Sequence, residues 1–476
     1  MAQLTARNDL GWHGKPEAHS IGLTPPPLHA AMTRCIRAAL ILALACSIPA
    51  DAQTLRSRIN DLFIFGSGQN VLHLGGTADP NNPQNIRVHG DHFVPAAVSQ
   101  NGSIITFLTV AAGQSVANVP IGATSSGETF RFEGGVPVKT STSAGPIMAE
   151  RSQTLGRGRA IVGVGRTHVP FSSLRGQDLG NLELSFTHQN VDFEGCDAQT
   201  GGPCAEMGFP LLENEVIQVR LDMAMDVSIT SFYATYGLFD FMDISFVLPL
   251  VSTEFNGVSE ATIVPFGGTT ATHFFEGTPT EPVLTATRSV QGSAFGVGDV
   301  AVRAKLLVRQ TQRASLALVG EGRFATGDDA DLLGAGYFSA RGIAALTALF
   351  GRFSPHVNGG YLYRNTQDAS DAILGTIGFD HLMSDGVTMA MDVISSLQVG
   401  ATRLRLPETV QITYPYNRSI RPTSIPELRD NIVDGSMGFK FSHPTGVTAI
   451  VNALVPLNVG GLRGKTVLTG GLEYAF

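Results

Sequence analysis

Apolar and polar residues alternate through most of the last two thirds of the chain. In residues 217–229 every second side chain is apolar, and the residues between them include Arg220, Asp222 and Asp226. A helix would rotate this pattern around its axis, whereas successive side chains of a strand point to opposite faces. The same period recurs in the ranges 300–309, 316–324, 387–393 and 449–455. The pattern predicts an all-β chain.

The length of the alternating stretches favours strands that cross a membrane. They run for roughly 10 to 13 residues, which suits a tilted transmembrane strand of about 9–11 better than a globular strand of about 5–6. Tight turns at 383–386 and 442–446 alternate with long loops at 251–296 and 402–433. Short turns at one end and long loops at the other are typical of an outer-membrane barrel. We therefore predict an antiparallel transmembrane β-barrel whose long loops face outward.

The alternating segments predict about fourteen strands, an even number as bacterial barrels require. Their expected ranges are 128–133, 158–169, 181–190, 216–236, 241–250, 298–309, 315–325, 337–349, 353–364, 372–382, 387–400, 434–442, 446–456 and 466–476.

The end of the chain supports the barrel prediction. Leu468, Leu472, Tyr474 and Phe476 fall on alternate positions, and the chain stops on phenylalanine. This resembles the terminal-strand signal by which outer-membrane barrels are recognised for assembly. Tyr474 and Phe476 are therefore predicted to be the assembly signal, with the barrel-assembly machinery and outer-membrane lipid as partners.

An export signal begins inside the sequence rather than at its start. Residues 32–37 form a short basic region with Arg34 and Arg37, residues 38–48 form an apolar core, and Ala50-Asp-Ala52 provides a small-x-small cleavage pattern. These are the parts of a secretory signal peptide, which we place at 32–52. Residues 1–31 are interpreted as a non-native upstream extension with Met32 as the initiator, the alternative being a genuine extension. A lipid-modified Cys46 is less favoured, because Ala43 stands where such signals usually have leucine.

Composition removes two other classes of protein. The 476 residues carry a net charge of -8 and no basic tract, so nothing suggests a nucleic-acid partner. No apolar stretch approaches the roughly 20 residues of a membrane-spanning helix.

The region between the signal and the barrel lacks convincing alternation. We predict a plug-like or periplasmic segment at 53–125, with an unstructured leader as the alternative, followed by the barrel at 126–476. Cys196 and Cys204 lie close together in a polar loop of an exported chain and are predicted to form a disulfide. A metal site there would need more ligands than the loop offers, so no metal is expected.

Ten charged residues at alternating positions are predicted to face the lumen, because a charge on the lipid face costs about 2–4 kcal/mol at mid-depth. Either they select which solutes pass, or they form ion pairs that only fill the lumen. They are Arg220, Asp222, Asp226, Arg303, Lys305, Glu321, Arg323, Asp380, Asp392 and Lys440.

Two further charged groups leave alternatives open. Asp328, Asp329 and Asp331 form either a Ca²⁺ site or an ordinary solvated loop. The charged stretch 150–159, which contains Glu150, Arg151, Arg157 and Arg159, either folds into the mouth of the barrel or forms a solvated turn.

Several motifs resemble one known family. They are Gly296-Val-Gly-Asp-Val-Ala-Val-Arg-Ala-Lys305, the Thr-Gly-Asp turn within 321–336, Pro355-His-Val-Asn-Gly-Gly-Tyr361, and the stretch 236–246. From about 215 to 476 the chain resembles the outer-membrane transporters of the MetA-pathway of phenol degradation family. Ala325 departs from that pattern, since the family usually has proline before the threonine. The family is similar in architecture to long-chain fatty-acid transporters with fourteen strands and an N-terminal plug, which implies a channel for hydrophobic compounds.

The predicted function is passive uptake of small hydrophobic solutes, aromatic or fatty-acid-like, across the outer membrane of a Gram-negative cell, without a cofactor. A water-filled diffusion porin is the main alternative, and a structural or adhesive barrel is less favoured. An enzyme is not expected and no catalytic residue is assigned. The sequence has no Gly-x-Ser-x-Gly motif, and its histidines lie on separate strands or turns with no nucleophile indicated.

Overall fold

The computed structural model describes twelve separate stretches of the chain. The chain divides into two units, residues 1–51 and 52–476, and every described residue belongs to the second. The described stretches are 53–66, 71–72, 74, 110–111, 130–133, 136–139, 143–187, 215–265, 273–278, 280–403, 406–412 and 417–476. None of these residues forms a helix long and apolar enough to cross a membrane. The predicted extension, signal peptide and Cys196–Cys204 disulfide all lie outside the described residues.

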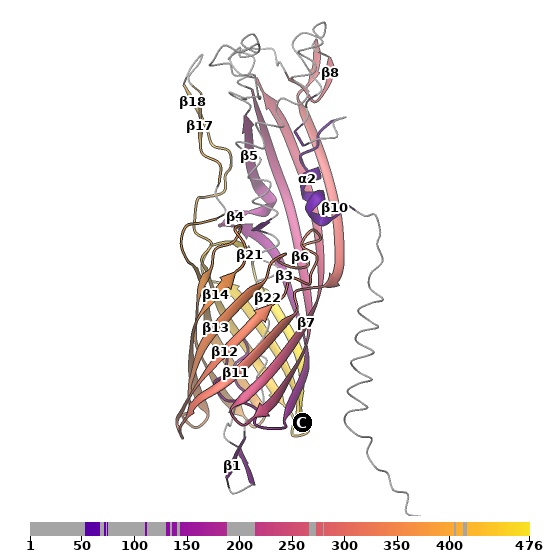
Figure 1. Ribbon diagram of the computed structural model, residues 1–476. Helices are drawn as coiled ribbons and strands as arrows, with labels where there is room; N and C mark the ends of the chain where they lie inside the picture. The colour runs from indigo at the N-terminus through magenta and orange to yellow at the C-terminus, as the bar shows by residue number, and fades with distance from the viewer. Residues whose placement is uncertain are drawn as a thin grey trace, which may run out of the picture. The chain divides into compact units, whose positions relative to one another are not determined.

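Twelve antiparallel strands close into a barrel within the described residues. In the order in which they pair around the ring they are β3 (Ala160–Leu174), β6 (Val216–Phe239), β7 (Met242–Val264), β11 (Ala301–Gln310), β12 (Ala314–Arg323), β13 (Ser339–Ala348), β14 (Phe353–Arg364), β15 (Ala372–Ser384), β16 (Val387–Gln398), β19 (Ile432–Ser442), β20 (Val447–Pro456) and β22 (Val467–Ala475). Pairing of β22 with β3 completes the ring. The short turns and the C-terminus lie at one end, which is the lower end in Figure 1 and is called the turn end here.

The predicted number of fourteen strands is too high by two. All twelve barrel strands were predicted, but the stretch 128–133 corresponds to β1 (Phe130–Glu133), which pairs only with β2 (Val136–Lys139). The stretch 181–190 corresponds to β5 (Leu182–Thr187), which pairs with the part of β6 that extends beyond β3. Both are real strands, but β1 has no neighbour in the ring and β5 has only one, and alternation alone does not reveal this.

Two long strands, β6 and β7, extend beyond the barrel. Near the turn end they pair with β3 and β11, and farther along they pair with β5 and with β10 (Thr285–Val297). We call the four-stranded extension β5-β6-β7-β10 the arm (Figure 1). The prediction that 251–296 is a loop is therefore wrong, because 251–264 continue β7 and 285–297 form β10. Between them lie β8 (Glu276–Thr278) and β9 (Glu281–Val283).

The two faces of β6 exchange their chemistry where the barrel gives way to the arm. Within the barrel, the outward side chains of Phe232 and Tyr236 are apolar or aromatic, and the buried Thr235 is polar. Within the arm the outward Arg220 is exposed and the buried Leu221 is apolar. From Ile217 to Gly237 every second residue is buried, apart from the half-buried Tyr233. The chemistry therefore inverts while the strand keeps the same face inward, as expected where the surroundings change from an apolar phase to water.

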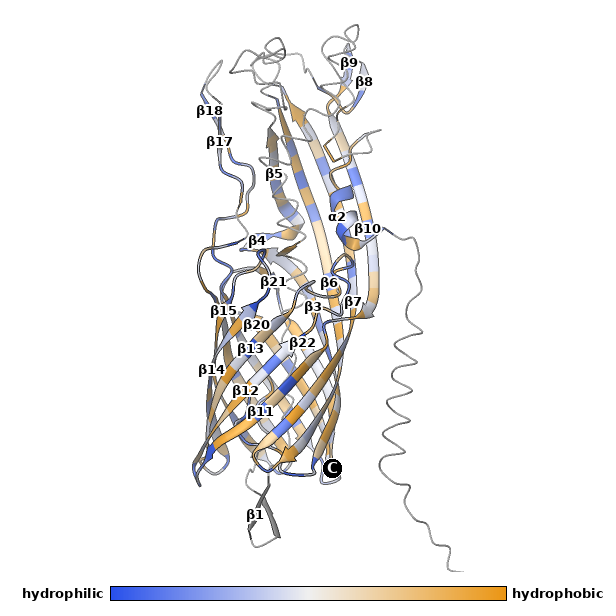
Figure 2. Cartoon of the chain, viewed as in Figure 1, coloured by the Kyte–Doolittle hydropathy of each residue, from blue (hydrophilic) through white to orange (hydrophobic). Residues whose placement is uncertain are grey.

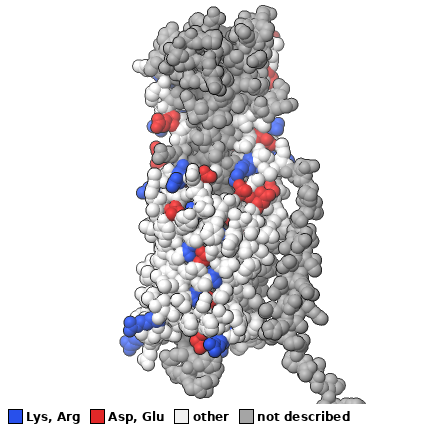
Figure 3. All heavy atoms as spheres, viewed as in Figure 1, with Lys and Arg blue, Asp and Glu red and all other residues white. Residues whose placement is uncertain are grey.

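Strand β7 inverts at the level where it pairs with the same part of β6. Asp243 is buried and Phe246 exposed in the barrel, whereas Phe255 is buried and Glu254 exposed in the arm. Figure 2 shows hydrophilic positions recurring along the arm and apolar ones along the barrel strands. Charged side chains are sparse on the barrel face visible in Figure 3.

The apolar inner face of the arm is covered by residues near the predicted mature N-terminus. Thr54 caps helix α2 (Leu55–Asp61) by accepting a hydrogen bond from the Ser57 N–H. Leu55 and Ile59 belong to the buried core formed with the arm. The ring of Phe63 packs edge-on against Phe186 of β5 at 5.8 Å. The longest described part of the predicted plug-like segment, 53–66, therefore packs on the arm, and most of 67–125 lies outside the described residues.

The acidic loop between β12 and β13 holds α2. Arg56 pairs with Asp329 at 3.0 Å, and the Leu55 N–H donates to Asp331 Oδ1 at 3.1 Å. Asp328 accepts from the N–H groups of Ala330 and Asp331 within its own loop. The described residues contain no group of three or more metal-ligating side chains, and these three aspartates serve as helix and turn anchors.

Short elements complete the end opposite the turns. The hairpin of β17 (Val410–Ile412) and β18 (Arg418–Ile420) lies within the predicted 402–433 loop, and β21 (Leu462–Gly464) pairs with β3. β4 (Gln177–Asp178) also pairs with β3 and is followed by the 3-10 helix η2 (Leu179–Asn181).

Candidate channel lumen

Residues 143–157, which precede β3, lie inside the barrel, and we call them the lumenal segment. From 143 to 156 they are buried, except for the half-buried Met148. Their contacts reach eight of the twelve barrel strands, namely β7, β11, β12, β13, β14, β15, β16 and β19. The interpretation of this charged stretch as a solvated turn is wrong for Glu150 and Arg151, which are buried, whereas Arg157 is exposed.

Glu150 anchors the middle of the lumenal segment to a cluster of basic side chains. Its carboxylate is bonded to the Arg303 guanidinium and lies 3.4 Å from Lys305 Nζ. Its backbone N–H donates to Asn358 Oδ1 at 2.7 Å. Burial alone would raise the pKa of Glu150, but the positive charges of Arg303, Lys305 and Arg341 outweigh burial and hold the pKa below its usual value of 4.5. The carboxylate is therefore ionised at neutral pH.

Strand register assembles the basic cluster, which consists of Arg303, Lys305, Arg323 and Arg341. Arg303, Glu321 and Arg341 stand directly opposite one another on the neighbouring strands β11, β12 and β13. The Glu321 carboxylate accepts from Arg303 Nε at 2.8 Å, Arg323 Nε at 2.9 Å and Arg341 Nη2 at 2.7 Å. Asp243, next to Lys305 in register, accepts from the Leu155 N–H at 3.1 Å.

A second polar group holds the start of the lumenal segment. The Ser143 hydroxyl donates to Asp380, and the Ala144 N–H donates to Thr388 Oγ1 at 2.9 Å. Lys440 Nζ donates to the Ala144 carbonyl at 3.3 Å. Asp380 is shared with His356 of β14, whose Nδ1 lies 3.6 Å away. The segment is therefore bound at both its start and its middle, by side chains on separate parts of the barrel wall.

The last part of the lumenal segment is tied to the turn end. Ser152 hydrogen-bonds the hydroxyl of Ser315 at 2.6 Å and that of Thr347 at 3.2 Å. Thr154 donates to the carbonyl of Asp240 in the β6–β7 turn at 2.7 Å. The Arg157 N–H donates to the Asp240 carboxylate at 3.1 Å.

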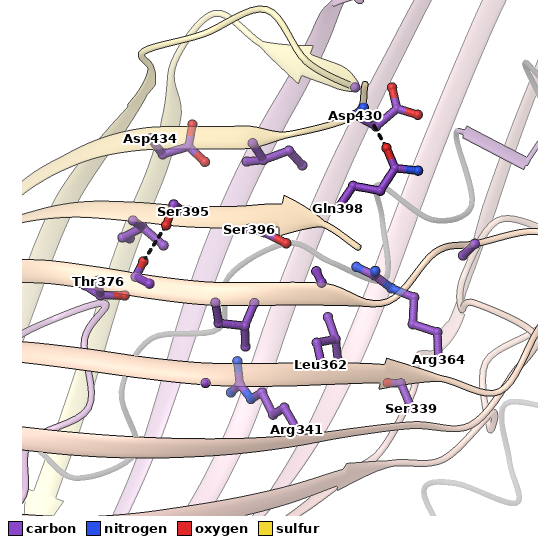
Figure 4. A pocket seen from close by; sticks show the side chains of 18 of the residues that line it. Ser339, Arg341, Leu362, Arg364, Thr376, Ser395, Ser396, Gln398, Asp430 and Asp434 are labelled. Carbon is purple, nitrogen blue, oxygen red and sulfur yellow. Dashed lines mark hydrogen bonds between the residues drawn. The ribbon is translucent and has the colours of Figure 1, made fainter. Parts of the chain in front are cut away.

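A cavity of about 270 Å³ lies in the lumen against Met148 and Glu150 of the lumenal segment. One part of its wall carries Arg323 and Arg341, with Arg364 farther along, as the labelled side chains of Figure 4 show for the last two. Another part is apolar and is formed by Val169, Phe171, Leu174, Leu454, Leu462 and Val467. The cavity thus combines a charged wall and an apolar wall.

Seven of the ten predicted lumen residues face the lumen, namely Arg303, Lys305, Glu321, Arg323, Asp380, Asp392 and Lys440. The prediction is wrong for the other three, Arg220, Asp222 and Asp226, which do not face the lumen. They lie on the outward face of β6, Arg220 and Asp222 in the arm and Asp226 where β6 begins to pair with β3. At this level water replaces lipid, so a charge facing outward carries no penalty. Asp226 lies 3.8 Å from His168 Nε2, and both side chains are about half exposed.

Sequence reasoning missed several lumen residues, including Asp243, Arg341 and His356. Arg341 was detectable, because it is a charged residue within the predicted strand 337–349. Asp243 is the first acidic residue after a turn, and a formal charge count of the sequence takes histidines such as His356 as neutral, so neither stood out as a mid-strand charge. Their roles become visible only through their partners.

The predicted assembly residues lie on the outside of the barrel. Tyr474 is 45% exposed and Phe476 is 62% exposed, and their rings stack at 5.6 Å. Backbone hydrogen bonds between Phe476 and Ala160 join the two ends of the barrel sheet. Their role as an assembly signal stays a prediction.

Solved structures with a similar arrangement are distant. The COG4313 outer membrane channel from Pseudomonas putida F1 is 12% identical with a TM-score of 0.37, over 68% of this chain and 98% of that one. A mutant of the TodX monoaromatic hydrocarbon channel is 9% identical with a TM-score of 0.31, over 67% and 90%. A Pseudomonas aeruginosa FadL homologue is 10% identical with a TM-score of 0.26, over 67% and 88%. No curated protein matches the chain in sequence.

The family comparison covers one continuous part of the barrel. Residues 229–384 match the model of the family described as Putative MetA-pathway of phenol degradation. This range begins where β6 changes its outward chemistry, ends with β15, and contains all four residues of the basic cluster. The resemblance to the MetA-pathway of phenol degradation family is therefore confirmed, for residues 229–384.

Proposed function

We propose that this protein is an outer-membrane channel for the passive uptake of small hydrophobic compounds, aromatic or fatty-acid-like, and that the lumenal segment closes it. The observation that carries the proposal is the cavity, which lies inside a barrel with an apolar exterior and is partly walled by Met148 and Glu150 of that segment. The confirmed resemblance of 229–384 supports the same function.

The exterior of the barrel supports a place in a lipid bilayer. Large apolar side chains are exposed around the ring, among them Phe246, Leu306, Leu318, Ile377, Met391, Val451 and Leu472. Exposing so much apolar surface to water would be unfavourable, whereas a barrel in lipid requires it. A soluble sandwich would instead turn these side chains inward.

The lumenal segment disfavours a permanently open diffusion porin. A porin needs a continuous water path, but here a buried segment is bonded to eight strands of the wall. Buried charge-assisted bonds such as Arg303–Glu150 are costly to break, because each leaves a charge unpaired. A solute therefore passes only if the segment moves, or if the solute leaves the cavity by another path.

Solute entry into intact cells tests this function. The full gene is expressed in a porin-deficient Gram-negative host, and entry of radiolabelled toluene is compared with that of arabinose. Lipopolysaccharide slows apolar solutes, so the channel is expected to accelerate toluene several-fold and to leave arabinose unchanged. Faster arabinose entry without an effect on toluene would support the porin instead.

A further inference from the structure

We infer that the lumenal cavity binds apolar solutes that carry one carboxylate group, with the carboxylate on the basic cluster and the apolar body on the opposite wall. The inference rests on the proposed function and names the substrate class of the same cavity. It follows from three features of the described residues: a local surplus of positive charge, an arginine atom without a partner, and an apolar wall across the ring.

The charge balance around the basic cluster favours an anion. Arg303, Lys305, Arg323 and Arg341 supply four positive charges, whereas Glu150, Glu321 and Asp243 supply three negative ones. Arg323 and Arg341 share a Glu321 carboxylate that Arg303 already binds through two nitrogens. A low-dielectric lumen strengthens this imbalance.

Two other carboxylates of the cavity wall are bound by arginines outside the basic cluster, and a third, Asp368, is accompanied on the wall by Arg364 and Arg403. Asp430 receives two bonds from Arg175, at 2.8 and 2.9 Å. Asp434 is bonded by Arg463. Each of these pairs is balanced by itself, so the excess positive charge stays with the basic cluster.

Arg341 offers an unfilled donor at the cavity. Its Nη2 donates to Glu321, but its buried Nε has no hydrogen-bond partner. A buried donor without an acceptor is unfavourable, so a solute carboxylate that reaches this nitrogen removes that penalty. Figure 4 shows Arg341 among the side chains that line the cavity, on the strand next to that of Leu362.

The apolar wall stands across the ring from the basic cluster. In the order of strand pairing β22, which carries Val467, is six strands away from β13, which carries Arg341. Its neighbours β20 and β3 contribute Leu454 and Phe171 to the same wall. A solute with a carboxylate head and an apolar body can therefore bind the two walls at once, whereas a neutral apolar solute binds only the apolar wall.

The test compares two probes that differ only at the head group, octanoate and 1-octanol. Equilibrium dialysis measures the binding of each to the full chain in lipid nanodiscs, with empty nanodiscs as the reference. Octanoate is expected to bind at least tenfold more tightly than octanol at pH 7. Arg341→Gln should remove that preference by weakening octanoate alone, and Arg341→Lys should retain most of it.

Arg352→Gln is the matched control, because Arg352 lies at the turn end outside the cavity with a side chain 58% exposed, and it should change neither probe. Folding of each variant is checked by the heat-dependent gel shift of barrels, and Arg323→Gln replaces Arg341→Gln if the latter does not fold. Equal binding of the two probes, or a preference that survives both glutamine variants, overturns the inference. If octanol still binds and toluene still enters cells, the channel function stands, whereas loss of both contradicts it as well.

Discussion

At the scale of single residues, Glu150 is the point where the lumenal segment depends most on charge. Its carboxylate lies between Arg303 and Lys305, and all three side chains are buried. Removing one partner of a buried ion pair is costly because the other charge is left uncompensated. The hold on the lumenal segment should therefore weaken sharply when this single charge is removed.

We expect Glu150→Gln to open the lumen to hydrophilic solutes. Neutralising the carboxylate leaves Arg303 and Lys305 repelling each other next to the segment, which favours its displacement. Cells that produce the variant should become more sensitive to vancomycin, a large polar antibiotic, by several-fold. Glu254→Gln, on the exposed outer face of the arm, is the control and should leave sensitivity unchanged. Equal sensitivity of the two variants would show that Glu150 does not hold the segment.

The same carboxylate predicts a dependence on pH. Because the pKa of Glu150 is held below its usual 4.5, its stabilising effect is complete above pH 4.5 and is lost as the pH falls through the lowered value. Liposomes containing the wild-type protein should stay closed to sucrose from pH 7 to 4.5 and swell faster only at lower pH. Glu150→Gln should swell equally across this range. Opening of the wild type between pH 6 and 7 would contradict this assignment.

At the scale of elements, β6 shows that one strand can serve two environments. Ala234 and Ala224 both point outward and are exposed, but one lies in the barrel part of the strand and the other in the arm. The partner of Ala234 across the sheet is Phe246, and the partner of Ala224 is Asn256. The boundary between lipid and water should therefore fall between these two levels.

This pair of alanines gives a matched test of the boundary. Ala234→Arg should cost about 2–4 kcal/mol of folding free energy in lipid, because it places a charge against the apolar phase. Ala224→Arg should cost less than about 0.5 kcal/mol, as an exposed surface change does. Urea titration of folding into lipid vesicles measures both. Equal costs for the two variants would place the boundary elsewhere.

The mouth of the barrel depends on Asp299, the aspartate of the Gly-x-Gly-Asp motif. Its carboxylate accepts from the N–H groups of Gly327 and Ala335 at 3.1 and 2.8 Å, and so folds the β12–β13 loop that holds α2.

Asp299→Ala should loosen this loop and α2, because two N–H groups lose their acceptor at about 1–3 kcal/mol in total. Limited trypsin digestion should then cleave at Arg56 or Arg58 several-fold faster than in the wild type. Asp385→Ala, at the fully exposed tip of the β15–β16 turn, is the control and should digest like the wild type. Unchanged cleavage after Asp299→Ala would mean that α2 is held without this loop.

The sequence predicted every barrel strand because alternation depends only on which face a side chain takes. It did not predict the arm, because the period of two continues through β6 and β7 while the chemistry of the faces is exchanged. Arg220 was therefore assigned to the lumen on the same argument that correctly assigned Arg303. The lumenal segment is irregular and has no period, so only the charges of Glu150 and Arg151 indicated that it was unusual.

At the scale of the whole molecule, three regions divide the work of a channel. The barrel presents apolar side chains outward, the arm continues two of its strands beyond the apolar belt, and the lumenal segment fills the lumen near the turn end. The cavity between the basic and apolar walls is the space this arrangement leaves for a solute. We therefore propose a closed lumen that still contains a binding cavity.

The conductance of the full-length wild-type protein in a planar lipid bilayer measures whether the lumen is closed. The protein is purified from host membranes as a barrel with a heat-dependent gel shift and is studied at pH 7 in 1 M KCl. We expect little or no steady conductance, because the lumenal segment blocks the path for ions. A large, steady, ohmic conductance from every inserted molecule would contradict it and would identify the protein as an open diffusion pore.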